Sequence, residues 1–258
     1  MWWDAVISWR ETRLFAGRGV RRFSRSAPLV ISALIFPIIM LFSQVVAFSS
    51  VAGAAFGGHY AQHLAPLVML TTASFAAAGT AAGLHSDLHS ALLGRLRTMP
   101  VRPMSLLAGR VLGDLVRVLA IGILAAAAAQ LVGFRFRTGL LALIAFFCVF
   151  LLFGCMVTWL AVAIAVYSRS TSQIQLLLRN PTTLLYLLST GFVPLAAFPA
   201  LLRPAVQANP MSVFTQSLVG LSYGGPIAGQ LAAAVGWAVA VSLGCAVAAV
   251  LRYRKLTG

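Results

Sequence analysis

The sequence predicts an all-α integral membrane protein with six transmembrane helices, and three observations lead to this fold class. Of the 258 residues, 60% are hydrophobic and only 9% are charged, with a mean hydropathy of +0.95. The apolar residues gather in six long runs, and the arginines lie mostly between these runs. A soluble domain with so few charges would lack a hydrated surface, whereas one helix needs about 20 apolar residues to cross a bilayer.

The six apolar runs account for most of the chain, and each has a length that can cross a hydrocarbon core. Their approximate bounds are 28–50, 64–84, 111–133, 139–166, 181–198 and 227–251. The fourth run is longer than a bilayer requires, which permits a tilted helix. We therefore expect residues 28–258 to form a single six-span transmembrane domain.

The stretch before the first run, residues 1–27, mixes tryptophan with arginine. Trp2, Trp3 and Trp9 are followed by six arginines from Arg10 to Arg25. Indole rings and guanidinium groups both favour the headgroup layer of a membrane. We expect this stretch to be an interfacial helix on the cytoplasmic surface.

The distribution of basic residues predicts the orientation of the spans. If the N-terminus is cytoplasmic, sixteen of the nineteen Arg and Lys residues fall on the cytoplasmic side. Only Arg135, Arg137 and Arg203 then fall outside. Cytoplasmic loops carry the excess of Arg and Lys in multi-span proteins. Both termini are therefore expected in the cytoplasm, in a bacterial plasma (inner) membrane.

The segment between the fifth and sixth runs is apolar but rich in proline. It carries Pro194, Pro199, Pro204 and Pro210. Proline removes an intrahelical hydrogen bond, so one straight span is not expected here. We expect extracytoplasmic re-entrant helices over about 196–222, with protein covering the freed backbone groups.

The loop after the second run predicts a short amphipathic helix at about 87–100. Leu88, Leu92, Leu96 and Met99 recur at the spacing of one helical face, and prolines follow directly. Arg95 and Arg97 lie away from that face. The alternative is a solvated loop that merely follows the positive-inside bias.

Several stretches in the same order resemble the ABC-2 type permeases, especially the daunorubicin-resistance (DrrB/DrrC-like) exporter subunits. These are "GRLRTMPVRPMSLLAGRVLGDLVRVL" after the second run, then "GFRFRTGLL", "STGFVPLAAFP" and "NPMS". The resemblance covers nearly the whole chain. It departs from the family at Asp87, where relatives usually have Glu, and at Val219, where they often have Arg.

The resemblance implies the permease half of an exporter driven by a separate ATP-binding cassette ATPase. Two permeases, identical or related, would dock on two ATPases through cytoplasmic coupling helices. The sequence has no G-x-x-x-x-G-K-[ST] phosphate loop, and its single lysine is Lys255. We expect no enzyme activity and no cofactor in this chain, with ATP and Mg²⁺ bound by the partner ATPase. The residues assigned to ATPase coupling are Asp87, Leu88, Leu92, Arg95, Leu96, Arg97, Met99 and Pro100.

A charge cluster is predicted at the cytoplasmic mouth of the third span. Arg110, Asp114 and Arg117 lie at i, i+4 and i+7, so the carboxylate can face an arginine on either side. Pairing lowers the cost of charge in a membrane. The cluster is interpreted as structural pairing, with a role in coupling or gating as the alternative.

Polar residues within the apolar runs mark a possible cargo pathway. The candidates are Thr71, Ser74, Ser189, Thr190 and Phe192, with Ser189–Pro199 as an outer wall. The alternative is that these hydroxyls bond between helices. The histidine pairs His59/His63 and His85/His89 fall about 33 Å apart along a helix, so no metal site is expected.

These observations predict a permease subunit that exports a hydrophobic or amphipathic cargo, a drug or a cell-envelope lipid. Its expected partners are the ATPase, a second permease and membrane lipid. Nucleic acid is excluded, because runs of apolar residues interrupt the cations. The alternatives are an ion-coupled secondary transporter or channel, and a membrane scaffold without transport. Ion coupling would place carboxylates at mid-membrane, where Asp114 is the only candidate.

Overall fold

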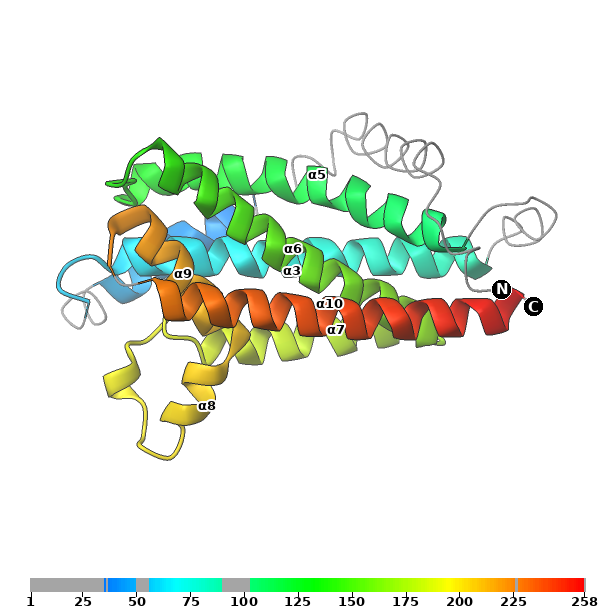
Figure 1. The fold of residues 1–258 in the computed structure, drawn as a ribbon. Coiled ribbons are helices and arrows are strands. Elements are labelled where there is room, and N and C mark those ends of the chain that lie inside the picture. The colour runs from blue at the N-terminus through cyan, green and yellow to red at the C-terminus, as the bar shows by residue number, and fades with distance from the viewer. Residues whose placement is uncertain (1–34, 36, 50–55, 90–102, 226, 258) are drawn as a thin grey trace.

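The computed structural model describes residue 35 and residues 37–49, 56–89, 103–225 and 227–257. These residues form helices, with no strand among them (Figure 1). A short apolar helix, Pro37–Ser49, comes first. The labelled elements are α3 (Tyr60–His89), α5 (Pro103–Ala129), η2 (Gln130–Val132), α6 (Leu140–Tyr167), α7 (Thr171–Leu187), η3 (Leu195–Ala197), α8 (Arg203–Ala208), α9 (Pro210–Tyr223) and α10 (Ala228–Thr257).

Four of the described helices are long and apolar enough to cross a membrane. The candidate spans are Tyr60–Asp87, Gly109–Val132, Leu140–Tyr167 and Ala228–Arg252. The prediction of an all-α membrane protein is therefore confirmed for the described residues. The full count of six spans stays a prediction, because the described part of the first predicted span and α7 are both shorter than these four.

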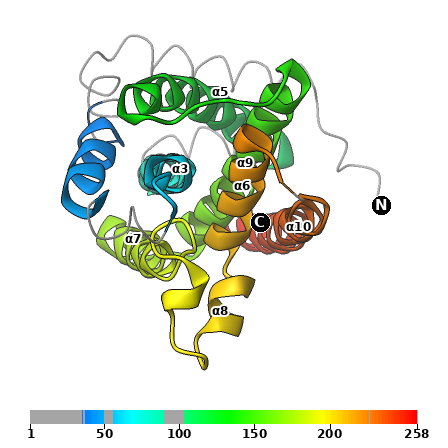
Figure 2. The same ribbon diagram turned by 90° about the vertical axis from the view of Figure 1, so that its left-hand side faces the viewer.

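Helix α3 lies at the centre of the bundle. Viewed along the bundle, it is surrounded by the Pro37–Ser49 helix, α5, α6 and α7 (Figure 2). Within the most apolar part of α3, 72% of the residues are buried inside the protein, against 17% for α10. Helix α10 packs on α6 and α9 and leaves its other side exposed. An apolar helix with an exposed apolar side suits contact with lipid.

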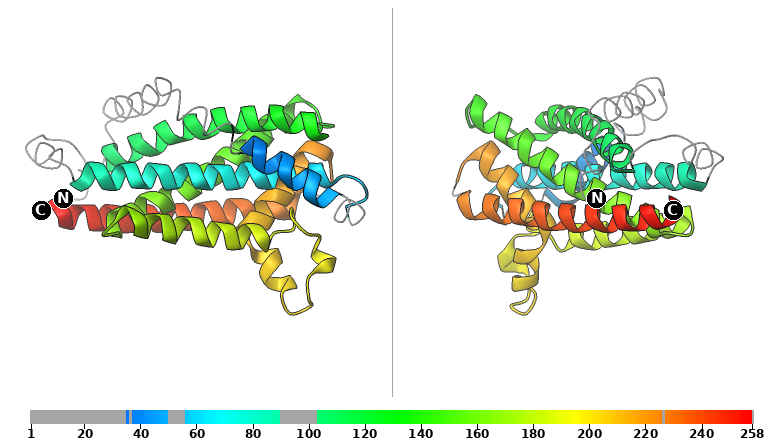
Figure 3. Two further views of the ribbon diagram at one scale, coloured as in Figure 1. Left: turned by 180° about the vertical axis from the view of Figure 1, so that it is seen from behind. Right: turned by 45° about the vertical axis from the view of Figure 1, so that its right-hand side comes forward.

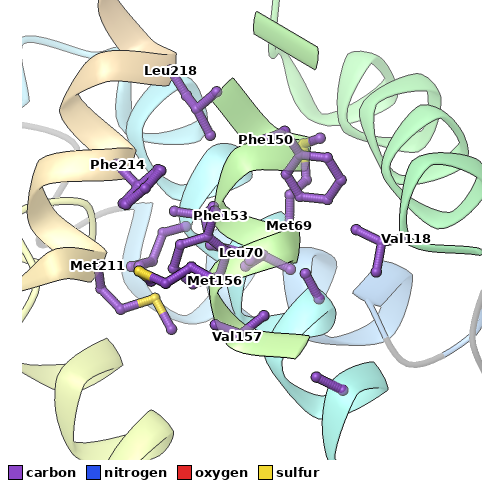
Figure 4. Close-up of a cluster of buried hydrophobic side chains, with 14 of the residues drawn as sticks. Met69, Leu70, Val118, Phe150, Phe153, Met156, Val157, Met211, Phe214 and Leu218 are labelled. Carbon is purple, nitrogen blue, oxygen red and sulfur yellow. The ribbon is translucent and has the colours of Figure 1, made fainter. Parts of the chain in front are cut away.

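A cluster of buried aromatic and methionine side chains lies where α6 meets α3 and α9. Phe150 and Phe153 of α6 are fully buried, and Phe153 meets Phe214 of α9 edge-to-face, with 5.0 Å between ring centroids (Figure 4). Met69 of α3 and Met156 of α6 occupy the neighbouring space. Edge-to-face aromatic pairs and flexible thioethers fill such crossings without leaving voids.

The loops are divided between two ends of the bundle. One end holds the C-terminus of α3, the start of α5, the α6–α7 turn and the end of α10 (Figures 1 and 3). We call it the α3–α5 end. The opposite end, which we call the α8–α9 end, holds residues 130–139 and the segment between α7 and α10. Arg135, Arg137 and Arg203 lie at the α8–α9 end.

The bounds predicted for the fifth run are wrong. The sequence indicates 181–198, whereas α7 runs from Thr171 to Leu187. The helix begins earlier because Ser170 caps it, its hydroxyl accepting a hydrogen bond from the Gln173 amide at 3.2 Å. It ends earlier because the apolar residues after Leu187 form turns around Gly191 and Pro194. Hydropathy alone does not distinguish these turns from helix.

The proline-rich segment after α7 forms three short helical pieces, η3, α8 and α9. Arg203 holds the first two together: its guanidinium donates to the carbonyls of Phe198 and Ala196 at 3.0 and 3.1 Å. Helix α8 stands away from the bundle, while α9 packs against α3, α6 and α10 (Figure 2). Pro210 occupies the first turn of α9, where its missing N–H costs nothing.

A loop at the α8–α9 end is fastened to α3 by one buried side chain. Gln62 of α3 is 3% exposed. Its amide nitrogen donates to the Arg135 carbonyl at 2.9 Å and to the Ser222 hydroxyl at 3.0 Å, and its oxygen accepts from the Arg135 amide at 3.0 Å. One amide group thus joins α3, the α5–α6 loop and α9.

Candidate functional site

Helices α3 and α5 are joined by an ion pair at the α3–α5 end. Asp87 lies in the last turn of α3 and accepts from Arg110 in the second turn of α5. Arg110 also donates to the Thr80 carbonyl at 3.3 Å. Gly83 leaves space for this guanidinium, since a Cβ there would lie 2.6 Å from Arg110 Nη2. The pair therefore connects the two helices that flank residues 90–102.

A second, deeper ion pair lies within the bundle. The Asp114 side chain is 4% exposed, and Arg117 Nη2 lies 2.5 Å from its Oδ1. Asp114 also accepts from Thr80 of α3 at 2.7 Å and from Thr158 of α6 at 3.0 Å. One carboxylate therefore holds three helices together. Arg117 in turn donates to the Ala76 carbonyl at 2.6 Å and to the Thr80 hydroxyl at 2.8 Å.

The two pairs replace the single cluster expected from the sequence. Asp114 pairs with Arg117, whereas Arg110 pairs with Asp87 on the neighbouring helix. Helical spacing allowed either arginine to reach Asp114, and the tertiary position of Asp87 decides between them. We call Asp87, Arg110, Thr80, Asp114, Arg117 and Thr158 the polar ladder.

The residues assigned to ATPase coupling are only partly described. Asp87 and Leu88 belong to α3, which ends at His89, so the predicted coupling helix does not begin at 87 as a separate element. The remaining assigned residues lie outside the described residues: Leu92, Arg95, Leu96, Arg97, Met99 and Pro100. Their role stays a prediction.

The polar residues of α3 proposed for the cargo pathway are buried and locally bonded. Thr71 and Ser74 are 1% and 5% exposed. Their hydroxyls donate to the carbonyls of Leu67 and Leu70 in the preceding turn, at 2.8 and 3.0 Å. In this conformation their hydrogen-bonding capacity is used within α3 itself.

The turn after α7, which contains the other pathway candidates, is held by α3 and α9. The Thr190 amide donates to the Ser212 hydroxyl at 3.1 Å, and Gln216 donates to the Thr190 hydroxyl at 2.9 Å. A Cβ at Gly191 would lie 2.7 Å from Thr215 and 3.0 Å from Leu67. Glycine is therefore required at this position for the turn to approach α3.

Asn209 joins the same turn to the start of α9. Its amide nitrogen donates to the carbonyls of Leu185 and Leu188, both at 2.8 Å, and its oxygen accepts from the Met211 amide at 2.8 Å. The side chain thus caps α9 and satisfies carbonyls at the end of α7. The sequence motif "NPMS" marked this place, but its spacing could not show that the asparagine also binds α7.

Phe192, the last pathway candidate, belongs to an aromatic group at the α8–α9 end. Its ring lies 5.4 Å from those of Tyr186 and Phe48, measured between centroids. Gln44 donates to the Tyr186 hydroxyl at 2.6 Å. The group connects the Pro37–Ser49 helix to α7. Its aromatic rings can pack against apolar or aromatic groups.

The described residues include no cluster of three or more metal-ligating side chains. Sequence reasoning missed Thr80, Gly191, Asn209 and Gln62. Only the asparagine and the glycine stood in recognised motifs. A hydroxyl in an apolar run gives no signal about which helix it faces.

Comparison with known proteins agrees with this architecture. The sequence pattern of the ABC-2 type transporter family matches residues 10–223. The chain is 25% identical over 245 residues to the probable doxorubicin resistance ABC transporter permease protein DrrC of Mycobacterium tuberculosis, covering 95% of this chain and 88% of that protein. It is 27% identical over 201 residues to the daunorubicin resistance ABC transporter permease protein DrrB1 of Streptomyces coeruleorubidus, covering 76% and 69%.

A further relative, the doxorubicin resistance ABC transporter permease protein DrrB of M. tuberculosis, is 28% identical over 200 residues, covering 72% of this chain and 66% of that protein. The family match covers more than four-fifths of the chain and includes every described helix except α10. The resemblance noted in the sequence is therefore confirmed. This multi-pass membrane chain belongs to the ABC-2 type transporter family.

Proposed function

We propose that this chain is the permease subunit of an ATP-binding cassette exporter, moving a drug or a cell-envelope lipid out across the bacterial plasma membrane. Family membership and relatives named for doxorubicin and daunorubicin resistance support the proposal. So do the long apolar helices with their lipid-compatible outer sides. The expected cargo is amphipathic, because Asp114 is the one charged side chain that is buried among the described residues, and it is paired with Arg117.

The observation that carries the proposal is the polar ladder. An ATPase that pushes on residues 90–102 would act on α3 and α5 together, because Asp87 and Arg110 join the two helices beside that segment. Asp114 and Thr158 extend the connection to α6. A hydrogen-bonded network that switches between two discrete arrangements can transmit motion from the α3–α5 end of the bundle to its other helices.

In this proposal the ATPase and its Mg²⁺–ATP site reside on another chain, and two permeases assemble with two ATPases. The α3–α5 end faces the cytoplasm. Basic residues support this orientation, since Arg110, Arg169, Arg252, Arg254 and Lys255 fall at or near the α3–α5 end. The chain termini would then both be cytoplasmic.

Association with the ATPase tests the proposal. The chain is co-expressed with an ATP-binding cassette ATPase from the same genome and purified through a tag on the permease. We expect the double variant Leu92→Asp/Leu96→Asp to lose the ATPase while still inserting in the membrane. Leu201→Asp is the matched control, since this leucine is 90% exposed at the opposite, α8–α9 end. Unchanged recovery of the ATPase with the double variant would contradict the proposed coupling surface.

A further inference from the structure

The loop between α5 and α6, residues 133–139, presents two exposed arginines at the α8–α9 end (Figure 1). Exposure alternates along it: Phe134 is fully buried and Phe136 half-buried, whereas Arg135 and Arg137 are exposed. The rings of the two phenylalanines meet edge-to-face, with 5.0 Å between their centroids. Packing of these rings against the bundle therefore anchors the loop and leaves both arginines on the surface.

Hydrogen bonds to two helices fix the backbone of both arginines. Gln62 of α3 bonds the Arg135 amide at 3.0 Å and the Arg135 carbonyl at 2.9 Å. The Arg137 amide donates to the Ser222 carbonyl of α9 at 2.8 Å. The loop is thus held between α3 and α9 through its main chain, and the two side chains are left to make other contacts.

The Arg137 side chain lies on an aromatic ring that also contacts a histidine. Its Cζ lies 4.5 Å from the ring centroid of Tyr223, the last residue of α9. The imidazole of His59, directly before α3, lies 5.3 Å from the same ring, measured between centroids. Arg135 donates one N–H to the Gln130 carbonyl at 3.1 Å and keeps further donors. We call Arg135, Arg137, His59 and Tyr223 the basic patch.

Strongly exposed leucines adjoin the basic patch along the chain. Leu131 precedes the loop, and Leu140 and Leu141 begin α6; the three are 73% to 83% exposed. They belong to the ends of the candidate spans Gly109–Val132 and Leu140–Tyr167. The patch therefore lies at the level where two spans leave the hydrocarbon core. At this level a phospholipid places its charged headgroup above its apolar chains.

The charge of the patch complements a lipid phosphate. Basic residues are few at this end of the bundle, where the sequence places only Arg203 besides Arg135 and Arg137. The carboxylates within the described part of the chain, Asp87 and Asp114, are paired with arginines of α5. Guanidinium groups bind phosphate through paired N–H donors, and a cation–π contact holds one of these two groups in position.

We propose that the basic patch binds the phosphate of an anionic phospholipid, whose acyl chains lie against Leu131, Leu140 and Leu141. This lipid is a resident ligand and not the cargo. Because the patch combines the start of α3, the α5–α6 loop and the end of α9, the bound lipid stabilises the packing of these three elements. The site requires neither the ATPase nor transport, and only its placement in the outer leaflet rests on the proposed orientation.

Lipid binding to the purified full-length chain, without the ATPase, tests the inference. The chain in dodecyl maltoside is titrated with phosphatidylglycerol or phosphatidylcholine of identical acyl chains, and bound lipid is measured by native mass spectrometry. Phosphatidylglycerol with a photoactivatable acyl chain locates the site by cross-linking. The variants are Arg137→Gln and Arg135→Gln/Arg137→Gln. Arg252→Gln is the matched control, since its guanidinium lies 5.6 Å from the Tyr167 ring centroid at the opposite end.

We expect the wild type to bind phosphatidylglycerol more tightly than phosphatidylcholine, with cross-links at residues 131–141. Each arginine near an anionic headgroup should contribute about fivefold, so Arg137→Gln should weaken phosphatidylglycerol binding about fivefold and the double variant about 30-fold. Arg252→Gln should keep both the affinity and the cross-links at the basic patch. Thermal midpoints without added lipid should be equal in all four proteins, because the substituted side chains are exposed.

Four results would overturn the inference. They are equal affinity of the wild type for the two lipids, equal losses in the double variant and Arg252→Gln, cross-links away from residues 131–141, and displacement of the lipid by excess inorganic phosphate. A lower midpoint of the double variant with unchanged lipid affinity would also do so, by showing that the arginines serve folding alone. None of these results bears on export, and a chain that binds the lipid here but moves no cargo with its ATPase would refute only the proposed function.

Discussion

Replacing Asp114 by Asn should destabilise the bundle far more than replacing Asp87, although each removes one carboxylate from one ion pair. The Asp114 side chain is 4% exposed and that of Arg117 is 22% exposed, against 39% and 25% for Asp87 and Arg110. Removing one partner of a buried ion pair leaves an uncompensated charge and costs about 3–5 kcal/mol. Because Arg117 keeps some exposure, we expect about 3 kcal/mol for Asp114→Asn. The half-buried Asp87–Arg110 pair is screened more strongly by solvent, so we expect a smaller loss of about 1 kcal/mol for Asp87→Asn.

The double variant Asp114→Asn/Arg117→Gln sharpens this prediction. It removes the stranded cation together with its partner and keeps neutral hydrogen-bonding groups of similar shape. We expect its free energy of unfolding to return to within about 1–2 kcal/mol of the wild type, since a buried pair and its uncharged replacement are often nearly equal in stability. The two single substitutions should therefore be strongly non-additive.

The measurement is reversible unfolding in mixed micelles of increasing SDS content, followed by circular dichroism. Asp87→Asn serves as the matched control for removal of one charge. Equal, small losses for Asp114→Asn and Asp87→Asn would refute the account of the buried pair. So would additive losses in the double variant, because they would show that Asp114 and Arg117 do not interact.

Three further substitutions test the packing at the α8–α9 end. Gly191→Ala should cost about 1–3 kcal/mol from overpacking. Gly236→Ala, in the interior of α10 with open space at its Cβ, should not lower the thermal midpoint, since alanine favours the helix more than glycine does. A Gly191→Ala midpoint equal to that of the wild type would contradict the close approach. Asn209→Ala should lower the unfolding free energy by about 2 kcal/mol through loss of the cap and two carbonyl bonds, and a neutral result would show that water replaces them. Gln62→Leu removes the bonds to Arg135 and should raise the rate of backbone amide hydrogen exchange at residues 134–138, whereas the exposed control Gln130→Leu should not change that rate. An unchanged exchange rate in Gln62→Leu would mean that other contacts hold the loop.

Hydropathy predicted the helical membrane fold because lipid imposes a strong and uniform constraint on composition. The runs at 139–166 and 227–251 correspond closely to α6 and to the candidate span of α10. The same criterion misplaced α7, whose first half is too polar to register as an apolar run. Its end was missed because the turn around Gly191 is as apolar as a helix.

The polar ladder shows why pairing was harder to predict than the helices. Helical spacing gave Arg110 and Arg117 equal access to Asp114. The choice depends on Asp87 and Thr80, which reach the site from another helix and lie 23 and 30 residues before Arg110 in sequence. Similarly, a glycine within an apolar run does not indicate that it makes room for a charged side chain, as Gly83 does for Arg110.

ATP-driven transport by the reconstituted subunits tests the account most directly. The purified chain is placed in liposomes alone, with its ATPase, and with its ATPase plus the Leu92→Asp/Leu96→Asp substitutions. We predict that amphiphile movement and ATP hydrolysis occur together only when the wild-type chain and the ATPase are both present. Movement driven by a proton or sodium gradient in liposomes that contain the chain alone, or ATP hydrolysis by the chain alone, would contradict the account.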